Sequence, residues 1–64
     1  MRHRLISSIK LQLQGELKSI EADIEAILED PTGLTSPTHL IRDKLKEAAA
    51  RQASLDMLAG FEEE

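Results

Sequence analysis

Carboxylates at helical spacing come nearest, in this sequence, to residues that could do chemistry. Glu21, Glu25 and Glu29 follow one another in steps of four, so a helix would place them in one row. Such a row can transfer protons or bind hard cations. The alternative, which we favour, is a solvated face that pairs with Arg42 and Lys46 of a neighbouring helix.

The remaining candidates for catalysis or metal binding are sparse. His39 and Asp43 are four residues apart and could supply two metal ligands, but a metal site needs at least a third. The sequence has no Cys, which excludes disulfides and thiolate metal sites, and it has no glycine-rich phosphate loop. We therefore expect a protein that is not an enzyme, with no catalytic residues, no metal and no cofactor.

The composition predicts an all-α protein of one domain. The chain has 64 residues, its apolar residues are almost all Leu, Ile and Ala, and its single aromatic residue is Phe61. Strands favour β-branched and aromatic residues in alternation, whereas Leu, Ala, Glu, Lys and Arg favour helices. No apolar run approaches the ~20 residues of a membrane span, and the start of the chain lacks the apolar stretch of a signal peptide. We expect a soluble, cytoplasmic protein without membrane contact.

Hydrophobic periodicity predicts two helices joined by a turn. The first spans about residues 2–29, the turn residues 30–36, and the second about residues 37–59, followed by an acidic tail at 60–64. Ser36 and Pro37 read as the N-cap and first residue of the second helix, with Thr38 as the alternative cap, and Gly60 is placed to end the helix. The predicted core stripe of the first helix is Ile6, Ile9, Leu13, Leu17, Ile20, Ile24 and Ile27. The predicted stripe of the second helix is Ile41, Leu45, Ala48, Gln52, Leu55 and Ala59.

Charge along the chain predicts that the helices fold back on each other. The net charges of residues 1–18, 19–30, 37–51 and 52–64 are +3, −5, +2 and −4. An antiparallel hairpin sets every block beside one of opposite sign. A turn centred near residue 34 would make facing residue numbers sum to about 68. That register places Asp23 beside Lys44 and Glu16 beside Arg51.

A chain this short buries little surface, so we expect self-association, as a homodimer that forms a four-helix bundle. The expected interaction residues are the apolar residues at the open end of the hairpin: Leu5, Leu11, Met57, Leu58 and Phe61. The basic residues at the start of the chain could contact the phosphates of a nucleic acid: Arg2, His3, Arg4 and Lys10. The net charge of −4 and the lack of stacking aromatics favour a protein partner instead.

Two resemblances bear on function. The size and hairpin plan resemble Rop-like plasmid copy-number regulators, dimeric four-helix bundles that bind RNA; this likeness is one of architecture, without matched residues. The run from Leu55 to Leu58 resembles part of a Leu-Asp-x-Leu motif of small hairpin phosphatases that act on sporulation response regulators. That family has Ser where this chain has Gln52, and we carry no function over. We expect a small bacterial or phage adaptor, inhibitor or regulator that binds protein, with a Rop-like nucleic-acid-binding regulator as the alternative.

Overall fold

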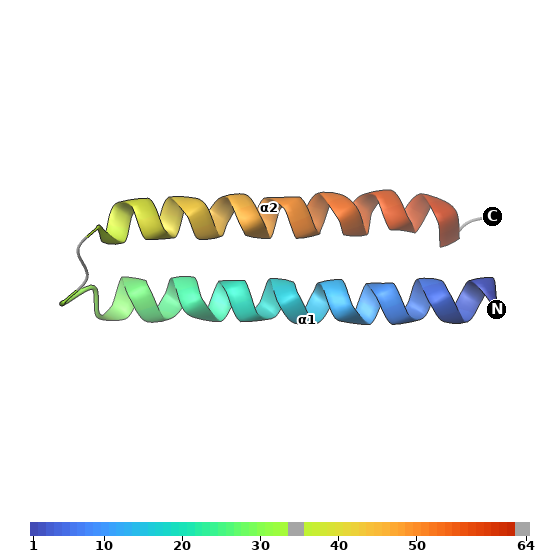
Figure 1. Cartoon of the computed structure of the whole chain (residues 1–64), viewed down its shortest axis with the longest axis horizontal. Helices are drawn as coiled ribbons and strands as arrows, with labels where there is room; N and C mark the ends of the chain where they lie inside the picture. Colours follow the sequence, from blue (N-terminus) through green and yellow to red (C-terminus); the bar gives the residue numbers. More distant parts are fainter. Residues whose placement is uncertain (34–35, 63–64) are drawn as a thin grey trace.

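The chain folds as an antiparallel hairpin of two long helices (Figure 1). The computed structural model describes residues 1–33 and 36–62. Helix α1 spans Arg2–Glu29 and helix α2 spans Pro37–Glu62, and they pack against each other along their length. The all-α hairpin expected from the sequence is therefore confirmed. Across the described residues, neither helix is long and apolar enough to cross a membrane.

The turn between the helices begins where proline follows Asp30. The backbone of Asp30 leaves the helical region, with φ −143° and ψ 84°, as expected of a residue before proline. Its Oδ1 accepts a hydrogen bond from the backbone N–H of Thr32 at 3.2 Å, which tightens the turn. Gly33 adopts φ 87°, a backbone conformation that residues with a Cβ rarely adopt and that glycine tolerates.

Helix α2 starts where the sequence predicted. The carbonyl oxygen of Ser36 accepts a hydrogen bond from the backbone N–H of Leu40 at 3.1 Å, the first helical bond of α2. Ser36 therefore occupies the N-cap position, with Pro37 as the first helical residue. Positions 34 and 35 of the expected turn lie outside the described residues.

The core between the helices is a narrow seam. Ile20 is the only described side chain that is buried, with 7% of its surface exposed. The other predicted core residues of α1 are half-buried along the seam except Ile9, which is 44% exposed. Because an isolated pair of helices has only one contact line, its apolar residues are covered from one side alone.

The seam of α2 differs from the predicted stripe. Leu45, Gln52 and Ala59 are exposed, so assigning them to the core was wrong. The half-buried positions instead alternate in steps of four and three: Pro37, Ile41, Lys44, Ala48, Arg51, Leu55 and Leu58. Lys and Arg can occupy such positions because their alkyl stems lie along apolar surface while their charged ends reach out. Gln52 donates a hydrogen bond from Nε2 to Asp56 Oδ1 at 3.1 Å.

Helix α2 also continues past its predicted end at residue 59. Gly60 lies within the helix and does not adopt a positive φ, so it does not act as the expected C-cap. Contacts with α1 account for the extension: Arg2 Nη2 donates to the carbonyl oxygen of Phe61 at 3.2 Å, and Lys10 Nζ lies 3.4 Å from Glu62 Oε1. The expected tail thus begins inside the helix, and its residues 63 and 64 lie outside the described part.

Candidate protein-interaction surface

Two ion pairs cross the seam on one side of the hairpin. Lys44 Nζ lies 3.2 Å from Asp23 Oδ2, and Arg51 Nε lies 3.1 Å from Glu16 Oε1. Both pairs were predicted from the register, and the structure confirms them. In each pair the two residue numbers sum to 67, one less than the register predicted. The two pairs lie seven residues apart on both helices. We call this arrangement the ladder.

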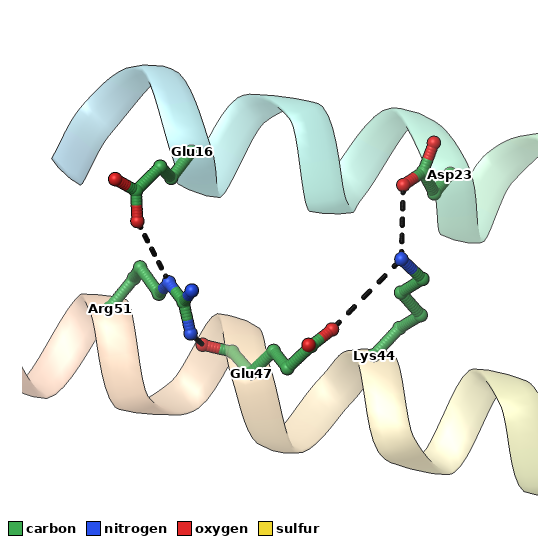
Figure 2. A network of polar contacts seen from close by, with 5 residues as sticks. All are labelled: Glu16, Asp23, Lys44, Glu47 and Arg51. Atoms are coloured by element: carbon green, nitrogen blue, oxygen red, sulfur yellow. Dashed lines mark hydrogen bonds and ion pairs between the residues drawn. The ribbon is translucent and has the colours of Figure 1, made fainter. Parts of the chain in front are cut away.

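Glu47 connects the two rungs of the ladder along α2 (Figure 2). Its Oε2 lies 4.0 Å from Lys44 Nζ, and its backbone carbonyl oxygen accepts a hydrogen bond from Arg51 Nη1 at 3.5 Å. The charged side chains of the ladder remain between 31% and 52% exposed. Pairs this exposed contribute only about 0.2–1 kcal/mol each, so the ladder fixes register more than it stabilises the fold.

An apolar pair continues the ladder toward the open end. Ile9 lies seven residues before Glu16, and Leu58 lies seven residues after Arg51, so they occupy the position of the next rung. Both line a hollow of about 370 Å³ with Leu13, Ser54, Met57 and Phe61. A second hollow of about 370 Å³ is lined by Met1, Arg2, Leu5, Ile6, Leu58 and Phe61. Because Leu58 and Phe61 line both hollows, the two form one continuous surface, which we call the open-end groove.

The open-end groove brings together four of the five predicted interaction residues: Leu5, Met57, Leu58 and Phe61. Phe61 is 51% exposed and Leu5 56%, so the groove is open to solvent. Leu11 is separate from it and 70% exposed. It lies nine residues from the buried Ile20, about two and a half helical turns, which points it away from the seam.

Six residues that line the groove were not among the predicted interaction residues: Met1, Arg2, Ile6, Ile9, Leu13 and Ser54. Ile6, Ile9 and Leu13 were assigned to the core, and Met1 and Ser54 were not considered for the interaction surface. The seven-residue spacing from Asp23 through Glu16 to Ile9 was the signal available for Ile9. It places Ile9 on the ladder side of the seam, where α2 covers it only in part.

The basic residues at the start of the chain are partly engaged by the end of α2. Arg2 donates to the carbonyl oxygen of Phe61, and Lys10 pairs with Glu62. His3 lines a further hollow together with Phe61 and Glu62, whereas Arg4 is exposed. These contacts place cations at the C-terminal end of a helix, where they interact favourably with its dipole.

The acidic row of α1 is exposed and does not form the expected ion pairs. Within residues 1–33 and 36–62, none of Glu21, Glu25 and Glu29 pairs with Arg42 or Lys46, so that part of the interpretation was wrong. The two basic residues lie farther round α2 than the seam positions Lys44 and Arg51. In the same described part, no group of three His, Asp or Glu side chains is arranged to hold a metal ion.

Comparison of this chain with protein-family models, with curated proteins and with solved structures gives no match. The ladder and the open-end groove are the features from which a function can be sought.

Proposed function

We propose that this chain is a small, non-enzymatic, cytoplasmic protein-interaction module, an adaptor, inhibitor or regulator, that works as a self-associated helical bundle. One observation carries the proposal: a single described side chain is buried, while apolar side chains gather around the exposed open-end groove. A helix must bury its apolar stripe against another element, and a lone hairpin leaves much of that stripe uncovered. Contiguous exposed apolar surface of this kind marks sites of protein association.

Nucleic-acid binding, the alternative expected from the sequence, has less support. Lys10 and Arg2 both contact the last turn of α2, where Glu62 supplies an opposing charge. Binding of phosphates there would compete with these contacts. A nucleic acid is therefore an alternative outcome of the test below.

Self-association is tested with the purified chain over a hundredfold range of concentration. If folding and association are linked, the thermal midpoint rises with concentration, and sedimentation gives about twice the chain mass of 7.1 kDa. A midpoint that does not change, together with the mass of one chain at the highest concentration, would overturn this part of the proposal.

Partner class is tested by two binding measurements on the same preparation. Affinity capture from a cell extract should give one stoichiometric protein, whose binding is then reproduced with purified components. In parallel, generic RNA and DNA are titrated at two salt concentrations. Tight, salt-sensitive binding to either nucleic acid, without a protein partner, would favour the Rop-like alternative over our proposal.

A further inference from the structure

We infer that a second copy of this chain covers the open-end groove, with α1 of each copy lying on α2 of the other and both open ends at the same end of the dimer. The two-fold axis then runs parallel to the long axis of the hairpin. This inference rests on the proposed self-association and adds which face is covered, in which orientation, and by which residues.

The ladder and the groove share one face of the hairpin. Residues seven apart on a helix return to nearly the same side, since seven residues make almost two full turns. On α1 this relation joins Ile9, Glu16 and Asp23, and on α2 it joins Lys44, Arg51 and Leu58. We call the surface along these six residues the ladder face. It is apolar at its open end and carries the paired charges of the ladder in its middle.

The surface that the chain exposes in excess of a compact monomer is large enough to form a stable dimer interface. The hairpin exposes 5137 Å². A compact monomer of 7.1 kDa would expose about 4,100 Å², so the chain exposes about 1,000 Å² more than its mass requires. Covering this excess on both copies would bury about 2,000 Å² in total, the upper end of the range for stable protein interfaces of standard size.

Residues beside the ladder face fit the same pairing between copies. One column of α1 flanks it with Leu5, Gln12, Ser19 and Ala26, and one column of α2 flanks it with Leu40, Glu47, Ser54 and Phe61. Leu5, Ser54 and Phe61 line the groove, which places the open ends of both columns on this side. If α1 lies antiparallel on the partner's α2 within one residue of the intrachain register, so that facing residue numbers sum to 66, the columns meet residue by residue.

In that pairing large side chains meet in the groove and small ones meet large ones near the turn. Leu5 lies opposite the partner's Phe61, and Ala26 lies opposite the partner's Leu40. Between them, polar Gln12 lies opposite the partner's Ser54. An interface with an apolar anchor and a polar remainder is typical of soluble assemblies.

Charge selects this orientation over the other two-fold arrangement. With α1 on the partner's α2, Glu16 faces the partner's Arg51 and Asp23 faces the partner's Lys44, so each rung meets charges of opposite sign. If the axis instead crossed the hairpin at right angles, α1 would lie on α1 and the two Glu16 carboxylates would meet near the axis. The groove would then face the turn end. Like charges placed opposite each other at an interface disfavour that arrangement.

The first test asks whether the groove is the covered face, by measuring the dimer dissociation constant of two variants. Phe61→Ala should raise it at least about tenfold, because each dimer loses two aromatic anchors. The matched control is Leu11→Ala, which removes an exposed apolar side chain from the opposite side of α1 and should change it less than about twofold. Equal effects of the two substitutions would contradict a dimer built on the groove.

The orientation is tested with a spin label at the turn, since the chain contains no Cys that would react. Thr32→Cys places one label on the exposed turn of each copy. In the inferred dimer the two labels are separated by the width of the bundle, about 20 Å. With the axis at right angles they would be separated by roughly the 47 Å length of the hairpin.

A second measurement uses the ladder itself. A variant with Glu16→Arg, Arg51→Glu, Asp23→Lys and Lys44→Asp keeps both rungs of the ladder and gives up the Lys44–Glu47 pair and the hydrogen bond of Arg51 to Glu47, but it reverses the charge of every rung residue offered to a partner. Mixed with the original chain at equal concentration, it should form fewer mixed dimers than the statistical half, as counted by native mass spectrometry.

These measurements distinguish the arrangement of the dimer from self-association itself. A dimer with a short label distance and a deficit of mixed dimers supports the inference. A dimer with a long label distance, or with a statistical number or an excess of mixed dimers, overturns the inferred arrangement and leaves the proposed self-association standing. A chain that stays monomeric at every concentration overturns both.

Discussion

Asp23 and Lys44 come from different helices, 21 positions apart in sequence, and their charged atoms lie 3.2 Å from each other. Neither residue is buried, yet together with Glu16 and Arg51 they record the alignment of the two helices. Sliding one helix by a turn would break both pairs at once. Register in this hairpin is therefore specified by charge at positions that contribute little burial.

Exchanging the charges of this pair should preserve the fold better than changing one alone. Asp23→Lys and Lys44→Asp should each lower the free energy of unfolding, and the double variant should recover about 0.2–1 kcal/mol relative to the sum of the two. Urea denaturation at one fixed chain concentration measures the difference. Glu25→Lys with Lys46→Glu is the control, because those side chains form no ion pair within the described residues. Coupling of equal size in the control pair would show that net charge, and not the rung, is responsible.

The three glycines should respond differently to alanine. An added Cβ meets nothing within 4 Å at Gly15 or Gly60, both of which are helical, so each substitution should stabilise by about 0.5–1 kcal/mol. Gly33 has φ 87°, and Gly33→Ala should destabilise by about 1–2 kcal/mol. Thermal denaturation of the three variants distinguishes the cases. If Gly60→Ala were destabilising, α2 would end near residue 59 in solution, as the sequence suggested.

Ile20 should be the most sensitive apolar residue of the seam. Ile20 is the single buried side chain of the described part. Ile20→Ala should lower the free energy of unfolding by about 2 kcal/mol or more, because the deletion leaves a gap that a narrow seam cannot refill. Leu11→Ala removes a side chain of similar size from an exposed position and should change the free energy of unfolding by less than about 0.5 kcal/mol. The comparison is made by chemical denaturation, and similar losses for the two variants would contradict the seam as described.

Gln52 should have little influence on folding or assembly. The sequence placed it in the core, where a polar residue can specify register, but the structure exposes it. Gln52→Leu should leave the oligomeric mass unchanged and shift the free energy of unfolding by less than about 0.5 kcal/mol. A new oligomeric state for this variant, seen by sedimentation, would mean that Gln52 lies at an interface after all.

The sequence predicted α1 and the ladder better than it predicted the seam of α2. The apolar stripe around Ile20 has the helical period, and a turn centred near residue 34 predicted the partners of Asp23 and Glu16. Lys44 and Arg51 were expected at the edge of the seam and not among its half-buried positions, because the sequence pattern assigned those positions to apolar side chains. Their hydrocarbon stems follow the seam, and this becomes visible only once the partner carboxylates are placed.

The open-end groove was predicted only in part for a related reason. Leu58 and Phe61 were expected at the open end, and both line the groove. Whether an apolar residue near a helix end joins such a surface depends on its angle around the axis relative to the neighbouring helix. That angle separates Leu11 from Leu5, although their side chains are identical.

The placement of Met1 and Glu62 at the same end of a 47 Å hairpin determines how the molecule would respond to mechanical force (Figure 1). Pulling the two ends apart loads the contacts between the helices one at a time, starting with the contact of Arg2 with the Phe61 carbonyl oxygen and then the pair of Lys10 and Glu62. The rung of Ile9 and Leu58 yields next, and the charged rungs follow. Pulling from the turn and one chain end would instead stretch a single helix along its axis and leave the contacts between the helices largely unloaded. The same hairpin should therefore yield at low force along one axis and resist along the other.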